Sequence, residues 1–350
     1  MKIRKAELAQ KLGKIKGVVP KKGADLALQG VLVSGGYLTA SNMQVTVRAK
    51  IGGGGEETFI IPERAFDLIA GLPDGEVEVS STGTDAIAIT AEKIRNRYQT
   101  MNPGLFPEAP GQGEEGVQPT IRAEVFLESI RRVSYAIPSQ GNNAVMSSLC
   151  LQAGRGELNF AGLDGRMLAW DRVAYGGEFE LLVPKEAVDI LKSIGLSGEL
   201  QIRHSLAGAS FVTEEFEVYT RLVDGKYFNY QAMFKKLPMR TAVPRENLLE
   251  AVSRAKMCAQ GKCPVRFRLE GNSLGLSVEG KTEEYHETVE LQKEMQESLE
   301  IGFNAKLVQE TLKAFSCGEV RLSFGGPRMP MVVEDGNSSF QAIVLPVATW

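Results

Sequence analysis

The sequence predicts an α+β fold in which one domain is repeated three times, each copy having two amphipathic helices against antiparallel sheets. The main observation is a stretch that reads strand, helix, Gly-Glu turn, strand. It occurs three times, at 59–79, 179–202 and 301–322. A second helix and a hairpin recur with the same spacing, so the repeated unit is larger than this stretch.

The spacing between the copies is that of whole domains. Pro62, Pro184 and Asn304 stand where each repeated helix begins, 122 and then 120 residues apart. Proline suits a first helical turn because its missing N–H would have no partner there, and asparagine is a good cap. Such a period is too long for a solenoid repeat and fits domains of about 100–150 residues.

The second helix opens each copy, beginning near positions 3, 121 and 243. Its apolar residues recur at helical spacing, as in Leu8, Leu12 and Ile15. Strand pairs with Gly or Asn turns then follow, and such alternating segments predict hairpins. They are 30–33 with 37–40, 149–151 with 158–160, and 265–269 with 274–278.

Two linkers rich in Pro or Gly separate the copies, at 102–119 and 237–244. We therefore predict domains at 1–118, 119–241 and 242–350. The glycine run 52–55 lies between strands without a phosphate-binding pattern around it, so it reads as a flexible loop.

Composition is that of an ordinary globular chain, with 43% hydrophobic and 24% charged residues. No apolar run approaches the ~18 residues of a membrane span, and the first residues lack the apolar core of a signal peptide. We expect a cytoplasmic protein with reduced cysteines. The two histidines, His204 and His286, are too few and too far apart to indicate a metal site or a catalytic triad, so no cofactor is expected.

Charge is distributed unevenly although the formal net charge is −3. Acidic runs lie outside the helices, while lysines and arginines lie on helix faces opposite the apolar stripes. A basic face on an acidic protein could hold a polyanion through phosphate contacts without reading sequence. The helix cations are Lys14, Arg131, Arg132, Lys185, Lys192, Arg254, Lys306 and Lys313.

Four motifs in order resemble the bacterial DNA polymerase III beta subunit, the sliding clamp, over essentially the whole chain. LDGRMLA at 163–169 is similar to TDGHRLA, and RLVDGKYFNY at 221–230 to KLV[DE]Gx[FY]P[DN]Y. IGFN at 301–304 and LPV at 345–347 match the family's I[GA]FN and its [ML]P[MIV] ending.

The resemblance implies a head-to-tail homodimeric ring whose helices line a pore around double-stranded DNA. It adds loop residues to the predicted DNA contacts, namely Lys21, Lys22, Lys93, Arg95 and Gln140. It also implies an interface between the first domain of one subunit and the third of the other. The interface residues would be Arg64, Tyr98, Met101, Met257, Cys258, Glu283 and Glu284.

The resemblance implies a second site, an apolar cleft between the second and third domains. The DNA polymerase III alpha subunit and clamp-loader subunits would insert short linear peptides there. Met and Leu side chains suit such adaptable recognition. The cleft would be formed by Met146, Leu163, Gly165, Arg166, Met167, Leu168, Phe228, Met233, Asn304, Leu307, Pro330, Ile343, Leu345 and Val347.

The cleft departs from the family pattern. Arg166-Met167 replaces His-Arg, Phe228 replaces Pro, and Ala232 replaces a common Arg. The sequence ends at 348–350 with ATW where a basic residue and leucine are usual. These changes put the preferred peptide in question more than the fold.

Two other functions compete with the clamp. One is an enzyme, with Asp164-Gly165-Arg166 and Asp224-Gly225-Lys226 as acid–base groups. No nucleophile–His pair, metal cluster or cofactor loop accompanies them in the sequence, and Asp-Gly is commonly a turn. The alternative is a peptide-binding scaffold of the same fold that does not encircle DNA. Loss of DNA binding with retained peptide binding would favour it.

Overall fold

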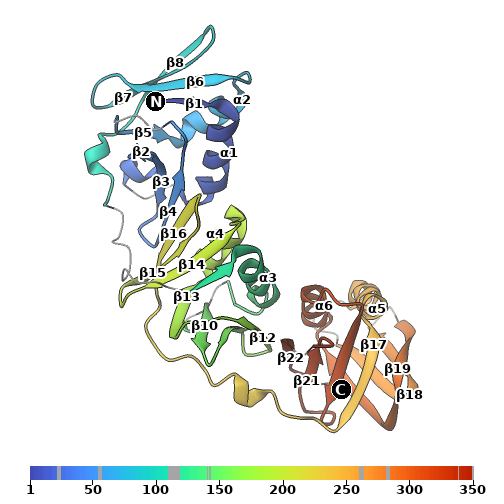
Figure 1. Ribbon diagram of the computed structural model, residues 1–350. Coiled ribbons are helices and arrows are strands. Elements are labelled where there is room, and N and C mark those ends of the chain that lie inside the picture. Colours follow the sequence, from blue (N-terminus) through green and yellow to red (C-terminus); the bar gives the residue numbers. More distant parts are fainter. Residues whose placement is uncertain are drawn as a thin grey trace. The chain divides into compact units, whose positions relative to one another are not determined.

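The computed structural model describes residues 1–21, 25–53, 57–108, 119–139, 141, 143–259, 264–280, 284–337 and 339–348. The chain forms two compact units (Figure 1). The first unit contains 1–127 and 186–222, and the second contains 128–185 and 223–350. Within the described residues, no helix is long and apolar enough to cross a membrane.

The first unit contains two antiparallel sheets with helices packed against them. The helices are α1 (Lys5–Ile15), α2 (Phe66–Gly71), the start of α3 (Ala123–Ser134) and nearly all of α4 (Lys185–Ile194). The smaller sheet has the order β1 (Lys2–Arg4), β6 (Glu76–Ser81), β7 (Ala86–Ala91), β8 (Ile94–Gln99). The larger sheet has the order β5 (Phe59–Pro62), β2 (Gly30–Ser34), β3 (Tyr37–Ser41), β4 (Val45–Lys50), β16 (Phe216–Arg221), β15 (Gly208–Val212), β14 (Glu199–His204), β9 (Thr120–Arg122).

The second unit repeats this plan with α5 (Arg245–Cys258) and α6 (Ala305–Ala314), which pack on each other and on the strands. A two-stranded sheet consists of β18 (Val265–Glu279) and β19 (Glu284–Phe303). The larger sheet has the order β13 (Phe179–Pro184), β10 (Ser148–Gly154), β11 (Glu157–Leu163), β12 (Met167–Ala174), β22 (Phe340–Val344), β21 (Met331–Glu334), β20 (Glu319–Phe324), β17 (Met239–Pro244).

Both predicted helices occur in each repeat, and one backbone contact explains their shared start. The first N–H of α1, at Lys5, donates to the carbonyl of Gly75 at 2.9 Å. In the second and third copies, Ala123 and Arg245 donate in the same way to Gly198 (2.8 Å) and Gly318 (2.9 Å). The Gly-Glu turn of one helix therefore supplies an acceptor for an N–H at the other helix's start, which would otherwise have no partner.

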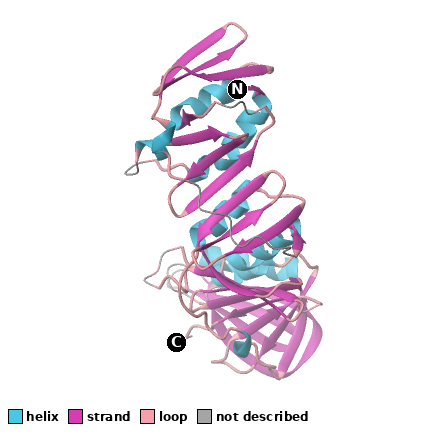
Figure 2. Cartoon of the chain, turned by 60° about the vertical axis from the view of Figure 1, so that its left-hand side comes forward, coloured by secondary structure: helices cyan, strands magenta, loops and turns pink. Residues whose placement is uncertain are grey.

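The large sheets run across the predicted repeats instead of stopping at their edges. In the first unit β4 pairs with β16, so that Val47 lies opposite Val218. In the second unit β12 pairs with β22, so that Leu168 lies opposite Ile343. Each junction is thus a backbone ladder with buried side chains. Figure 2 draws the strands of these sheets in magenta.

The third predicted hairpin lies within a single assigned strand. β18 continues from Val265 to Glu279, with irregular register near Gly271, where φ is 54°. The Arg266 guanidinium donates to the Glu279 carboxylate at 2.8 Å, so the two ends of this strand lie together. The chain therefore doubles back near Gly271, inside the predicted turn.

Candidate functional site

The predicted peptide cleft has an apolar floor in the second unit, at the β12–β22 junction. Leu168 and Ile343 are only 3% and 5% exposed and belong to one cluster that spans the second and third repeats. Met146, Trp170 and Phe234 pack against its side. The buried members are Cys150, Ala161, Leu163, Leu168, Leu182, Tyr227, Tyr230, Leu237, Val332 and Ile343.

The predicted cleft residues divide into floor and rim. Phe228, Met233, Leu345 and Val347 remain between 37% and 47% exposed, which leaves apolar surface open to solvent. Gly165, Arg166 and Asn304 are also exposed, and Met146 and Pro330 are half-buried. Buried positions are Leu163, Met167, Leu168, Leu307 and Ile343.

A turn at one end of the cleft is held by Asp164. Its carboxylate accepts from the backbone N–H groups of Arg166 (2.9 Å) and Met167 (2.8 Å), and the Arg166 guanidinium lies 3.3 Å away. Gly165 has φ 80°, a conformation that favours glycine. The N–H of Leu345 then donates to the Arg166 carbonyl at 2.9 Å. The Asp-Gly pair is therefore a structural turn that joins the second repeat to the end of the third.

The segment after β16 covers the floor with aromatic side chains. Trp170 lies 5.8 Å from Tyr230 and 5.3 Å from Phe234, and its indole N–H donates to Asn159 at 2.9 Å. Burial raises the pKa of the Tyr230 phenol, which remains neutral and donates to Gln152 at 3.1 Å. Asn304 accepts from the Lys306 N–H at 3.0 Å as the cap of α6. The aromatic rings therefore form one side of the apolar cluster.

The predicted DNA-binding cations on the helices are mostly paired with carboxylates. Arg254 donates to Glu287 at 2.6 and 3.0 Å and to Glu250 at 3.3 Å. The hydrogen bond from Arg254 lowers the pKa of Glu287. Similar pairs join Arg131 to Glu128 (2.6 Å), Lys192 to Asp189 (4.0 Å) and Lys306 to Glu310 (3.8 Å).

Two predicted DNA-binding cations have apolar or buried partners. Lys14 lies over the Phe216 ring, 5.0 Å from its centroid. Arg132 is 21% exposed and contacts Glu128 (3.2 Å), the buried carboxylate of Asp171 (3.5 Å) and the Ser316 hydroxyl (3.4 Å). Arg132 therefore helps to join the second repeat to the third, and less of its charge remains for a phosphate.

The remaining predicted DNA contacts lie at several places on the two units. Lys21, Lys93, Arg95 and Lys313 are exposed, and Lys185 is half-buried at the start of α4. Lys22 and Gln140 lie outside the described residues. Sequence reasoning found the helix cations through their spacing, but not the carboxylates that neutralise them.

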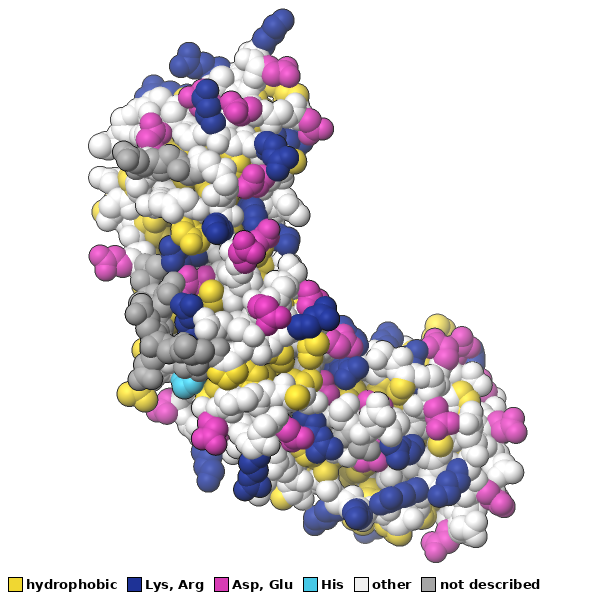
Figure 3. Space-filling model, in the orientation of Figure 1, with side chains coloured by type: hydrophobic (Ala, Val, Ile, Leu, Met, Phe, Trp, Pro, Cys, Tyr) yellow, Lys and Arg dark blue, Asp and Glu magenta, His cyan; other side chains and the backbone are white. Residues whose placement is uncertain are grey.

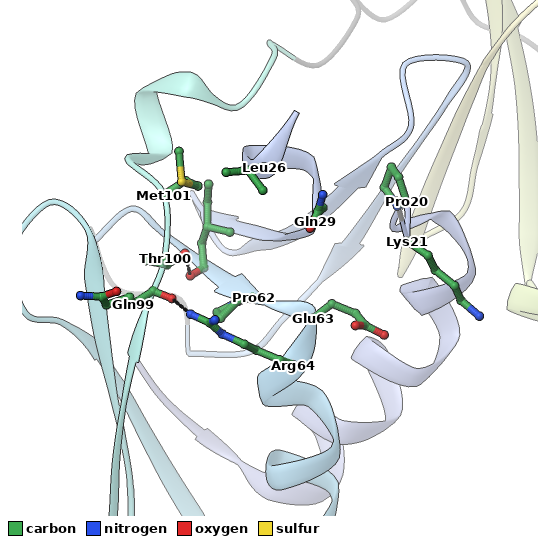
Figure 4. A pocket seen from close by; sticks show the side chains of 11 residues that line it. Pro20, Lys21, Leu26, Gln29, Pro62, Glu63, Arg64, Gln99, Thr100 and Met101 are labelled. Carbon is green, nitrogen blue, oxygen red and sulfur yellow. Dashed lines mark hydrogen bonds between the residues drawn. The ribbon is translucent and has the colours of Figure 1, made fainter. Parts of the chain in front are cut away.

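Predicted interface residues of the first unit surround a cavity of about 640 Å³, shown in Figure 4. Arg64 and Met101 line it, and the Arg64 guanidinium donates to the Gln99 carbonyl at 2.5 Å. Tyr98 lies on β8, the edge strand of the smaller sheet. The cavity is therefore continuous with an open sheet edge.

In the second unit the predicted interface residues lie at the end of α5 and the start of β19. Met257 is 80% exposed, whereas Cys258 is half-buried. Glu284 is exposed, and Glu283 lies outside the described residues. Within the described residues, no group of three or more His, Cys, Asp or Glu side chains could hold a metal ion.

Comparison with known proteins agrees with this arrangement. The family model of the DNA polymerase III beta subunit, C-terminal domain, matches residues 235–348. A beta sliding clamp from Synechococcus elongatus is 25% identical, with 98% of each chain covered. The third predicted domain therefore matches the C-terminal domain of that family. The Escherichia coli K12 beta sliding clamp is 23% identical over 83% of this chain and 81% of its own length.

Solved beta subunits share the fold throughout. The beta subunit of Thermotoga maritima has a TM-score of 0.91 and 23% identity, covering 100% of this chain and 99% of its own. A Pseudomonas aeruginosa sliding clamp bound to griselimycin has a TM-score of 0.93 and 22% identity, with 100% and 99% covered. The predicted α+β clamp fold is thus confirmed.

Several residues beside the predicted cleft were not predicted as part of the site. Tyr230 lies inside the quoted 221–230 motif, so its aromatic character was a usable signal. Trp170 and Phe234 could not be connected before the fold placed their rings together. Met329, 41% exposed in the turn before Pro330, was missed because no motif covers it.

Proposed function

We propose that the protein is a non-catalytic sliding clamp that encircles duplex DNA in the cytoplasm and tethers polymerase through the apolar cleft. The proposal is supported by the clamp fold over the whole chain together with an apolar cluster that the second and third repeats share. Topological linkage would make tight DNA binding unnecessary. Weak, screened phosphate contacts allow a closed ring to slide.

The ring would close by pairing the first repeat of one subunit with the third of another. Met257 offers an exposed apolar side chain, and the cavity beside Met101 offers a place to bury one. Opposite charges support the same pairing, because edge strand β8 carries Arg95 and Arg97 while β19 is rich in glutamate. Complementary charge favours correct registration of such an interface.

The proposed domains remain 1–118, 119–241 and 242–350, with one refinement at the last boundary. β1 and β9 open the first two copies, each directly before a helix. By the same pattern β17 opens the third copy, so its first residue would be Met239.

A second candidate is a peptide-binding scaffold of clamp fold that does not hold DNA. It is favoured by the pairing of helix cations with carboxylates, because an ion-paired arginine attracts phosphate less strongly. Both candidates would bind a peptide in the cleft. They differ only in whether the pore holds DNA. DNA retention therefore separates the two candidates.

The test loads the protein on nicked circular duplex with a bacterial clamp loader and then linearises the DNA. We expect retention on the circle at moderate salt and loss from the linear form. Met257→Glu, which places a charge in the proposed interface, should give monomers on sizing and no retention. Val125→Glu, an exposed position on α3, is the matched control and should leave the dimer intact.

Equal loss from circular and linear DNA would contradict the clamp. If the wild-type protein nevertheless bound a polymerase-derived peptide, the scaffold would be the better description. A protein that is monomeric at all concentrations would remove the basis for a ring.

A further inference from the structure

The surface around the peptide cleft carries cations that lack carboxylate partners. Four of them, Lys226, Lys235, Lys236 and Arg328, are exposed. Within the described ranges, no carboxylate lies within ion-pair distance of any of the four. This contrasts with the helices, where most of the arginines and lysines named above pair with glutamates or aspartates.

The sequence neighbours of three of these cations belong to or pack against the floor cluster. Lys226 adjoins Tyr227, and Lys235 and Lys236 lie between Phe234 and Leu237, all of which belong to or pack against the floor cluster. They follow or precede η5 (Gln231–Met233) on one segment. Figure 3 shows Lys and Arg side chains along the lower edge of the second unit, where Figure 1 draws that segment.

Arg328 reaches the same area from the β20–β21 turn. Its neighbour Met329 contacts Gly325, and Leu237 of the floor cluster lies against the same glycine. Three carboxylates lie on the surrounding segments: Asp164, which pairs with Arg166, Asp224 beside Lys226, and Glu180 on β13. The balance of charge on the rim is therefore positive although the whole chain is acidic.

Apolar surface lies between these cations. Large apolar side chains are exposed in the described part of the second unit mainly on the segments that border the cleft. Met257 is the exception among them. Two methionines and one phenylalanine in this set fit varied apolar anchors. The exposed set is Phe228, Met233, Met329, Leu345 and Val347, with Met257 elsewhere.

We propose that the partner peptide of this cleft carries acidic residues flanking an aromatic and aliphatic core, and that Lys226, Lys235, Lys236 and Arg328 select it by charge. This inference rests on the proposed peptide-binding function of the cleft. The apolar anchors enter between Phe228 and Leu345, and the flanking carboxylates meet the lysines of the η5 segment. A basic rim around an apolar centre favours such a peptide over a nucleic acid, because a nucleic acid would leave the aliphatic surface uncovered.

The test uses two fluorescein-labelled synthetic peptides with the same core of one phenylalanine and two leucines. One has glutamate flanks and the other glutamine flanks. We expect the acidic peptide to bind about tenfold more tightly at low salt, the sum of a few exposed ion pairs. The difference should shrink as salt rises because exposed charges are screened.

Variants separate charge from apolar docking. Lys235→Gln with Lys236→Gln should weaken the acidic peptide about fivefold and leave the neutral peptide unchanged. Phe228→Ala should weaken both peptides. The matched control removes two exposed lysines of the first unit, Lys2→Gln with Lys50→Gln, and should change neither affinity.

Equal binding of the two peptides would overturn the proposal. Displacement of the acidic peptide by a single-stranded oligothymidylate with the same number of negative charges would overturn it too. Failure of both peptides to bind would also overturn it. The proposed clamp function is judged separately by retention on circular DNA, which needs no cleft peptide once loading has occurred. The two hypotheses therefore fail by different results.

Discussion

Removing Arg132 should destabilise the second unit far more than removing the adjacent Arg131. Arg132 is 21% exposed and faces Asp171, whose side chain is 1% exposed. Taking away one partner of a buried pair leaves an uncompensated charge and costs about 3–5 kcal/mol. Because Arg132 keeps some solvent contact, we expect Arg132→Ala to lower the free energy of unfolding by about 3 kcal/mol.

Arg131→Ala is the matched control. Arg131 is 44% exposed and pairs with Glu128, so its loss should cost about 0.5 kcal/mol, as for other surface pairs. Urea unfolding followed by tryptophan fluorescence measures both, because Trp170 lies next to Asp171 on β12.

A double variant tests the cause. Asp171→Asn in the Arg132→Ala background removes the stranded charge and should recover about half of the loss, as a double-mutant cycle would show. Equal costs for Arg131→Ala and Arg132→Ala would refute the reasoning. So would a double variant no more stable than Arg132→Ala alone.

Two further predictions concern DNA retention and pH. Glu287→Gln frees Arg254 from its carboxylate and should strengthen retention on circular DNA a few-fold. Glu290→Gln makes an equal charge change on the same strand and should strengthen retention less. The salt concentration at which half of the protein is retained measures both effects. Burial raises the pKa of Asp171 above the ordinary 3.8, so the folded state holds this proton longer than the unfolded state. The contribution of Asp171 to the free energy of unfolding should therefore be greatest near and below pH 3.8 and should fall as pH rises through the folded pKa. Urea titrations at several pH values should show this decline in the wild type and not in Asp171→Asn. Parallel pH profiles of the two proteins would contradict this.

The helices were predictable because local signals agreed with one another. In α6, Asn304 caps the first turn, and the apolar positions Leu307, Val308 and Leu312 are all buried in the structure. Repetition added a second signal, since three equivalent starts are unlikely to arise from chance patterning. The Gly-Glu turn was visible as a motif, but its role as acceptor for the other helix was not.

The charge pairing could not be read from the sequence. Glu287 is 33 residues from Arg254, and Glu215 is 204 residues from Lys11, with which it forms a 2.8 Å ion pair. Such ion-pair partners depend on how the helices pack on the strands. Helical spacing in the sequence indicates only which face of a helix a cation occupies. The position of Lys11 could not be predicted from the sequence either. Its ammonium lies 4.4 Å from the centroid of the Phe216 ring, which is far away in the sequence.

The cleft was predictable from the resemblance at its floor and less so at its rim. Leu168 and Ile343 were predicted as cleft residues, and the structure buries both in the apolar cluster. Phe228 replaced a usual proline, and its 39% exposure shows that the change lies on the accessible rim. The departure from the family pattern therefore falls where it would alter partner choice without disturbing the sheet beneath.

The difference between paired and unpaired cations has a consequence for how the protein would work. A ring that slides must not bind phosphate strongly, and internal carboxylates such as Glu287 keep the attraction of Arg254 for DNA low. A partner that must be found and held benefits from the opposite arrangement, because unpaired charge speeds encounter. Lys235 and Lys236 supply that charge at the cleft. Under the proposed function, the same chain would release DNA and capture a peptide through the placement of a few carboxylates.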